Sequence, residues 1–82
     1  MVTVKFFARL RELLGESSMT FEITSNTTVS DITALFSERS EAWAEALNDP
    51  SIVTALNHSV CEHDAVVKNN DELAYFPPVT GG

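Results

Sequence analysis

The first segment of the chain alternates between apolar and polar side chains with a period of two residues. Every second position is apolar, at Val2, Val4 and Phe6. This alternation predicts a strand over residues 2–7 with one face against a core. Phe7 adds an apolar side chain to the second face, which favours a central position in a sheet.

The pattern then changes to a helical period. Leu10, Leu13 and Leu14 share one face, which predicts a short helix over residues 8–14. Gly15 can end this helix, because glycine adopts the left-handed conformation of a C′ residue without a steric penalty. Alternation returns over residues 19–24 and predicts a second strand, with its inward positions at Met19, Phe21 and Ile23.

Two further helical stretches follow. Thr28 and Asp31 resemble an N-cap and its acidic N3 partner. The helix that they begin has an apolar stripe at Val29, Ile32, Leu35 and Phe36. A second helical piece covers residues 40–47 and ends at Asn48-Asp49-Pro50. Its apolar face is formed by Ala42, Trp43, Ala46 and Leu47.

The C-terminal half is richer in strands and turns. We predict a strand over residues 51–57, a turn-rich stretch over 58–64, a short strand over 65–67, a turn over 68–71 and a last strand over 72–76. Strands and helices fall in separate blocks, which indicates an α+β domain with helices packed on one face of a sheet. We expect the first and last strands to lie side by side and parallel at the sheet centre.

Length and charge restrict the classes of protein to which the chain can belong. Eighty-two residues suffice for one domain, which we expect over residues 1–76, with an extended tail over 77–82. The net charge of −7 with five Lys and Arg argues against a nucleic-acid binder. It is compatible with a basic protein partner or simply with solubility. No apolar run reaches the ~18 residues of a membrane span, so we expect a cytoplasmic protein.

Three candidate metal ligands or nucleophiles lie close together in the turn-rich stretch: His58, Cys61 and His63. Zinc needs four ligands in a tetrahedral array, and an extended segment would point His58 away from the other two. We therefore expect no metal site here. The neighbours Glu62 and Asp64 disfavour a thiolate, so we also interpret Cys61 as an inert thiol.

The end of the chain is the most informative segment. Its last seven residues are uncharged and read Phe76-Pro77-Pro78-Val79-Thr80-Gly81-Gly82. The two prolines have no N–H and a fixed φ, so a strand cannot continue through them. Six residues from Pro77 onward can reach roughly 20 Å. Gly81 and Gly82 lack a Cβ and can enter a narrow slot, where a terminal carboxylate could be activated. The alternative is an incidental flexible end.

Tyr75 and Phe76 are the large side chains before this tail. Alternation sends them to opposite faces of the last strand. We expect one to lie in the core and the other to form an apolar patch with Pro78 and Val79, of the kind that protein interfaces favour. The alternative is that both rings pack inside the protein.

These residues together resemble the ubiquitin-like sulfur carriers of the β-grasp fold, in particular the small subunits of molybdopterin synthases. The resemblance rests on residues 6–15, on the acidic turn of residues 70–73 and above all on the ending Phe76-Pro77-Pro78-Val79-Thr80-Gly81-Gly82. The chain departs from many relatives at Asn69-Asn70, where they place a glycine. The stretch from His58 to His63 matches no motif of the family.

The resemblance implies a non-catalytic carrier. An adenylating enzyme similar to ubiquitin-activating enzymes would use ATP to activate the Gly82 carboxylate, and a sulfur donor protein would convert it to a thiocarboxylate. The tail, with Phe76, Pro77, Pro78, Val79 and Thr80 as partner-binding residues, would then enter the large synthase subunit. There it would give sulfur to a pyranopterin precursor. The chain itself is expected to bind no cofactor and no metal.

Three alternatives remain open. A thiamine-thiazole sulfur carrier would use the same terminal chemistry, although those carriers lack the Pro-Pro-Val-Thr approach to the glycines. A protein modifier would form isopeptide bonds through Gly82. A binding module would have an incidental tail.

Overall fold

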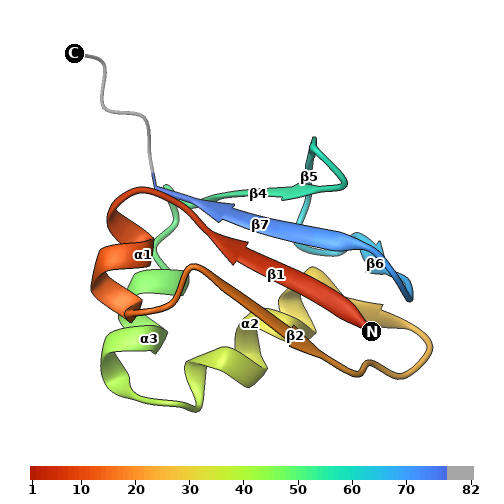
Figure 1. Cartoon of the computed structure of the whole chain (residues 1–82), viewed down its shortest axis with the longest axis horizontal. Helices are drawn as coiled ribbons and strands as arrows, with labels where there is room; N and C mark the ends of the chain where they lie inside the picture. Colours follow the sequence, from red (N-terminus) through yellow and green to blue (C-terminus); the bar gives the residue numbers. More distant parts are fainter. Residues whose placement is uncertain (78–82) are drawn as a thin grey trace.

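The two ends of the chain meet at the centre of one sheet. In the computed structural model, which describes residues 1–77, β1 (Val2–Phe6) and β7 (Glu72–Phe76) lie side by side and parallel (Figure 1). The remaining strands pair antiparallel in the order β2-β1-β7-β4-β5. They are β2 (Ser18–Phe21), β4 (Val53–Leu56) and β5 (Ser59–Cys61). The predicted parallel pair at the sheet centre is confirmed.

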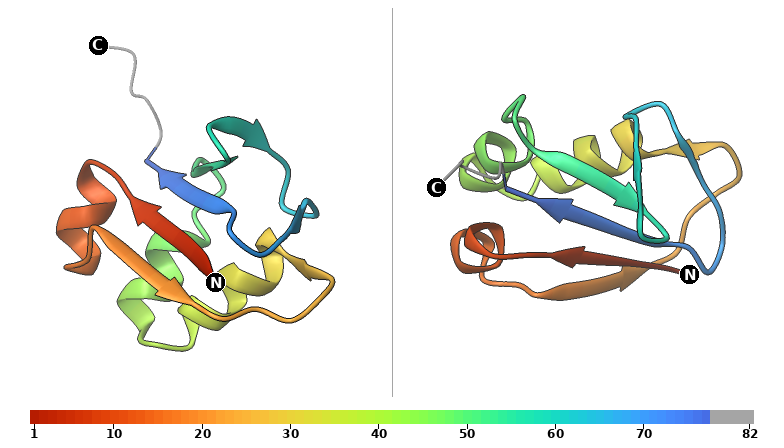
Figure 2. Two further views of the ribbon diagram at one scale, coloured as in Figure 1. Left: turned by 45° about the vertical axis from the view of Figure 1, so that its right-hand side comes forward. Right: turned by 90° about the horizontal axis from the view of Figure 1, so that it is seen from above.

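Residues 1–77 also form three helices. Helices α2 (Val29–Ser37) and α3 (Glu41–Leu47) pack on one face of the sheet, as Figure 2 shows. Helix α1 (Arg9–Leu14) lies at the end of the sheet where β1 and β7 finish. A two-stranded sheet of β3 (Thr27–Thr28) and β6 (Val66–Val67) lies toward the opposite end. The expected α+β arrangement is therefore present.

The helix ends follow the local signals of the sequence. Thr28 and Asp31 form a reciprocal capping box, in which the Asp31 N–H donates to Thr28 Oγ1 and the Thr28 N–H donates to Asp31 Oδ2. Ser40 caps α3 by accepting from the Trp43 N–H. Gly15 ends α1 at φ 74° and donates its N–H to the carbonyl of Arg11. The predicted cap of α2 and the predicted end of α1 are confirmed, whereas Ser40 was expected to lie within the helix and instead caps it.

Aromatic rings form the centre of the core. The Phe6 ring lies edge-on to Phe36 and Trp43, at centroid distances of 5.8 and 5.4 Å, and stacks on Tyr75 at 5.7 Å. Edge-to-face and offset contacts of this kind are favourable beyond the area that they bury. The cluster joins β1, β7, α2 and α3, so it fixes the start and the end of the chain to the same helices.

Several details differ from the expected pattern. Leu13 and Leu35 were expected on inward stripes, yet they are 62% and 53% exposed. Leu35 lies about 100° around α2 from the buried face, and that face turns toward Thr33, whose hydroxyl has partners in the core. In the short helix α1, Leu10 and Leu14 make the core contact and leave Leu13 outside. Ala42 is likewise exposed.

The strand boundaries were also partly wrong. Strand β2 ends at Phe21 rather than at residue 24, and β4 is shorter than residues 51–57. The stretch from 58 to 64 was expected to be rich in turns, and no strand was predicted there, but it holds β5. This strand was missed because Val60, its only large apolar residue, is 79% exposed and gives no alternating core signal.

Candidate interaction site at the end of strand β7

The last described residues leave the centre of the sheet at its α1 end (Figure 1). Strand β7 is paired on one side with β1 and on the other with β4. It ends at Phe76, and Pro77 follows with no N–H to donate to either neighbour. Any segment beyond Pro77 therefore starts from a strand that is held on both sides. Pro78, Val79, Thr80, Gly81 and Gly82 lie outside the described residues.

Tyr75 anchors the end of the strand on the core side. Its side chain is 1% exposed, and its hydroxyl lies 2.6 Å from Thr33 Oγ1. Thr33 donates its own proton to the carbonyl of Val29, so Tyr75 is the donor in their contact. Burial raises the pKa of Tyr75 to about 12, although the hydrogen bond with Thr33 acts in the opposite direction. The ring therefore stays neutral and ties β7 to α2.

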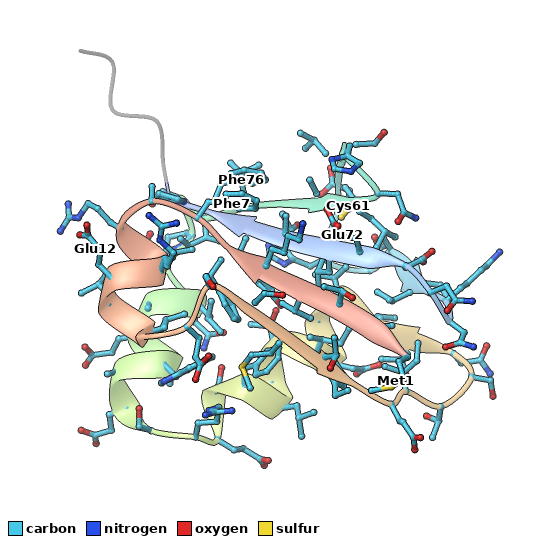
Figure 3. The ribbon with its side chains drawn as sticks, in the orientation of Figure 1. Met1, Phe7, Glu12, Cys61, Glu72 and Phe76 are labelled. Atoms are coloured by element: carbon cyan, nitrogen blue, oxygen red, sulfur yellow. The ribbon has the colours of Figure 1, made fainter. Side chains whose placement is uncertain are left out.

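Phe76 points to the opposite face, as the alternation predicted. Its ring stacks on Phe7 with a centroid distance of 4.8 Å and an interplanar angle of 9°. Figure 3 shows the two rings together where β1 and β7 end. Phe7 remains 39% exposed and donates its N–H to the carbonyl of Tyr75. The predicted division into one core ring and one surface ring is confirmed. The part of the predicted patch that involves Pro78 and Val79 lies outside the described residues.

A hollow that we call the α1 groove lies beside this aromatic pair. Its volume is about 650 Å³. It runs between α1 and the connection from α3 to β4, and its lining is largely apolar: Phe7, Ala8, Arg9, Leu10, Leu13, Ala46, Asp49, Ile52, Val53, Phe76 and Pro77. Sequence reasoning missed this groove because it assigned Leu13 to the core. The root of the tail is thus one wall of an open apolar groove.

The backbone at the junction of β1 and α1 is unusual. Ala8 has φ 53° and ψ −127°, a region that residues with a Cβ rarely adopt. The chain turns sharply there, so Phe7 finishes beside β7 while Arg9 begins α1. This local conformation sets Phe7 and Arg9 on the same groove.

Charge around the tail root differs from the charge of the whole chain. Three of the five Lys and Arg residues lie in β1 and α1: Lys5, Arg9 and Arg11. On the sheet face away from the helices, Lys5 Nζ lies 3.3 Å from Glu72 Oε1, and His58 Nε2 lies 3.5 Å from Glu72 Oε2. Such exposed pairs contribute about 0–1 kcal/mol. The overall acidity of the chain is therefore not repeated at the groove, whose lining contains one basic and one acidic residue, Arg9 and Asp49.

The three candidate ligands of the turn-rich stretch have separate surroundings. His58 lies at the turn between β4 and β5 and faces Glu72. Cys61 is half-buried, and its thiol contacts Thr54 Oγ1 at 3.6 Å. His63 follows β5, and its carbonyl accepts from the N–H of Ser30. Among residues 1–77, no group of three His, Cys, Asp or Glu side chains is placed to hold a metal ion.

Within the described part of the chain, no helix has the length and apolar content that crossing a membrane requires.

Comparison with known proteins adds three findings. The model of the ThiS family matches residues 4–82. The molybdopterin synthase sulfur carrier subunit of Haemophilus influenzae is 37% identical over 82 residues, and the match covers 100% of both chains. SAMP1 of Haloferax volcanii, a small archaeal modifier protein, superposes with a TM-score of 0.82 at 26% identity, covering 99% of this chain and 98% of its own.

A fourth comparison concerns a complex. The structure of subunits 1 and 2 of the molybdopterin-converting factor from Helicobacter pylori contains a chain that is 26% identical, with a TM-score of 0.66. The match covers 99% of this chain and 97% of that one. Together with the modifier protein, it identifies the fold as the ubiquitin-like β-grasp that the sequence predicted.

Proposed function

The chain belongs to the ThiS family, and from this membership we propose that it is a sulfur carrier for the biosynthesis of the molybdenum cofactor. The observation that carries the proposal is the full-length match, at 37% identity, to a molybdopterin synthase sulfur carrier subunit. The ending Pro77-Pro78-Val79-Thr80-Gly81-Gly82 supports it, because a terminal glycine carboxylate is accessible to an activating enzyme.

The proposed chemistry takes place at the Gly82 carboxylate. A carboxylate oxygen attacks the α-phosphate of ATP on an adenylating enzyme, and pyrophosphate leaves. A persulfide sulfur of a donor protein then attacks the acyl carbon, and AMP leaves. A thiol attacks the donor's sulfur in the resulting acyl disulfide, so that the S–S bond breaks, a disulfide forms on the donor side and a thiocarboxylate remains on Gly82. The thiocarboxylate sulfur is more nucleophilic than a carboxylate oxygen, so it can attack a pyranopterin precursor. Water then hydrolyses the resulting thioester, which leaves the sulfur on the precursor and returns the Gly82 carboxylate.

In this proposal the chain positions its terminus and contributes no catalytic side chain. Strand β7 is paired on both sides, and Tyr75 is buried and hydrogen-bonded to Thr33. The tail is therefore attached to a rigid base, which lowers the entropic cost of placing Gly82 in a partner. Phe76 and Pro77 are the first residues that such a partner would meet.

The proposed partners are the large subunit of molybdopterin synthase, the adenylating enzyme and the sulfur donor protein. The complex of subunits 1 and 2 from Helicobacter pylori, in which one chain resembles this one, supports the first of these. The exposed ring of Phe7 beside Phe76 supports a protein contact at the tail root. We place this function in the cytoplasm, where ATP is available for the activation.

A second candidate function is protein modification through Gly82. The similarity to the small archaeal modifier protein of Haloferax volcanii favours it. The first chemical step would be the same adenylation, but the ε-amino group of a target lysine would then displace AMP and form an isopeptide bond. The two functions therefore differ in the nucleophile that attacks the activated terminus.

Intact-mass analysis separates these functions. The purified chain is incubated with the adenylating enzyme of its own organism, ATP and a sulfur source. A carrier gains at its C-terminus the mass difference between sulfur and oxygen. Once Cys61 has been blocked, iodoacetamide labels the chain only if Gly82 carries a thiocarboxylate. A modifier forms adducts of higher mass with other proteins. With an active adenylating enzyme, an unchanged mass would refute the carrier function, and the absence of adducts when other proteins are present would refute the modifier function.

A further inference from the structure

The α1 groove is lined partly by apolar side chains that do not contribute to the core and remain exposed. Its floor is built by buried side chains, Leu10 and Ile52, which are 2% and 8% exposed. Its lining also includes two exposed apolar side chains, Leu13 and Val53, which are 62% and 37% exposed. Single exposed apolar residues are ordinary, but here two of them line the same open hollow. The groove therefore has the form of a receptor for an apolar side chain.

The rim of the groove provides a charge as well. Arg9 lines it, and the only ion pairs found among residues 1–77 involve Lys5, His58 and Glu72. Asp49 lies on the same rim, but its Oδ1 accepts from both the N–H and the hydroxyl of Ser51. The guanidinium of Arg9 is thus available to bind a carboxylate of another molecule in a bidentate way.

The groove is continuous with the root of the tail. Phe76 and Pro77 line the groove, and the next residue of the tail begins within about 3.8 Å of Pro77 Cα. A protein that encloses the tail from Pro78 onward therefore comes close to the groove. This adjacency indicates that the occupant of the groove is the protein that holds the tail, rather than an unrelated ligand.

We propose that the α1 groove receives an apolar side chain of the large synthase subunit, and that a carboxylate of this subunit pairs with Arg9. The proposal rests on the proposed function. It assigns to α1, and to Leu13 in particular, a role in docking that is separate from the chemistry at Gly82. It also explains why α1 exposes a leucine beside the tail root.

The first test compares two exposed leucines on helices. Leu13→Asp places a charge in the groove, whereas Leu35→Asp makes the same change on α2, outside the groove lining. Affinity for the purified large subunit of the same organism is measured by calorimetry with the full chain. We expect Leu13→Asp to weaken binding about tenfold or more and Leu35→Asp to change it less than about twofold.

A second pair of variants tests the charge. Arg9→Glu and Arg11→Glu change the net charge of the chain equally, but only Arg9 lines the groove. We expect Arg9→Glu to weaken binding several-fold more than Arg11→Glu, and this difference to shrink at high ionic strength. Equal effects of the two variants would refute the proposed pairing with Arg9.

Several controls keep the outcomes distinct. Thermal unfolding verifies that each variant is folded. If Leu13→Asp is unstable, Val53→Thr tests another lining residue of the groove with a side chain of similar shape. Suppose that the wild-type chain loads sulfur and binds the large subunit, and that Leu13→Asp and Val53→Thr bind as tightly as the wild type. This result would refute docking in the α1 groove and leave the carrier function intact. An effect of Leu13→Asp confined to adenylation or to self-association would also overturn the assignment to the large subunit. Failure of the wild type to load or bind would refute the proposed function itself.

Discussion

The two ends of β7 are built in opposite ways. At its start, polar groups of two turns are bonded to one another: the Glu72 N–H donates to Asn57 Oδ1, Asn57 Nδ2 donates to Asp71 Oδ1, and the Lys68 N–H donates to Asp71 Oδ2. At its end, the surface is apolar and open, with the Phe7–Phe76 stack and the α1 groove. At the start of β7 the polar groups are hydrogen-bonded within the chain. At its end an apolar surface remains exposed and available for contact with another molecule.

This difference separates stability from function along a single strand. Hydrogen bonds that close turns stabilise the fold but offer little to a partner. Exposed aromatic and aliphatic side chains do the reverse, because they gain their burial only on binding. We therefore expect changes at the start of β7 to alter the free energy of unfolding, and changes beyond its end to alter sulfur transfer.

The largest effect is expected beyond the end of β7. Deleting Gly82 should abolish sulfur loading. The new terminal carboxylate, on Gly81, would lie about 3.3 Å away from the position that the Gly82 carboxylate occupies when it reacts with ATP on the adenylating enzyme. The temperature of thermal unfolding should stay unchanged. Intact mass after incubation with the adenylating enzyme, ATP and a sulfur source measures the loading. A truncated chain that still gains sulfur would show that the terminal carboxylate is not the reacting group.

The next effect is expected at the start of β7. Asn57→Ala removes the side-chain bonds to Asp71 and from the Glu72 N–H, and it places a Cβ residue at φ 50° without the stabilising side chain. We expect the free energy of unfolding to fall by about 2 kcal/mol, measured by urea titration. Asn57→Gly tolerates the positive φ, so the difference between the two variants isolates the backbone strain. Normal sulfur loading in both variants is expected, and reduced loading would break the separation of the two ends.

Local signals in the sequence were sufficient for most of the fold. The alternation at Val2, Val4 and Phe6 and the capping pair Thr28 and Asp31 depend only on residues nearby in the sequence, and the structure agrees with both predictions. The wrong predictions concern residues whose burial is determined by contacts with segments far away in the sequence. Leu35 matches a helical stripe, but the buried face of α2 includes Thr33, whose hydroxyl contacts Tyr75 in the core, and this face leaves Leu35 outside.

The candidate site was predictable only in part, for the same reason. Alternation alone placed Tyr75 and Phe76 on opposite faces, and their burial agrees. The α1 groove needed the tertiary structure, because residues that line it, such as Leu13 and Val53, come from segments far apart in the chain. No periodicity signals that a leucine of an amphipathic helix faces a hollow instead of the core.

A smaller effect is expected from the buried anchor of the tail root. Tyr75→Phe removes one hydrogen bond to Thr33, whose own proton still reaches the carbonyl of Val29. We expect a loss of about 1 kcal/mol in the free energy of unfolding. The loading of Gly82 should not change, since the ring itself still packs on Phe6. Reduced loading at normal stability would show that the Tyr75 hydroxyl also helps to position the tail. The functional region at the end of β7 would then include this buried hydrogen bond.

The smallest effect concerns pH and the start of β7. The side chain of Asn57, and after it the N–H of Lys68, hold the pKa of Asp71 below its ordinary value. The fold therefore favours the ionised carboxylate, and this contribution is fully present above about pH 4, where unfolded aspartate is ionised. It is lost as the pH falls through the lower pKa of the folded state.

Asp71→Asn removes this titration. At pH 7 the variant should be less stable by under about 1 kcal/mol, because the group lies near the surface, and it should approach the wild type as the pH falls below 4. Urea unfolding over a pH series measures both curves. Asp49→Asn is the matched control, since hydrogen bonds from Ser51 lower the pKa of Asp49 at the other end of the molecule. The two changes should flatten the pH dependence additively. Parallel curves for Asp71→Asn and wild type would mean that the polar network at the start of β7 does not favour the charged form, and that its hydrogen bonds act as neutral ones.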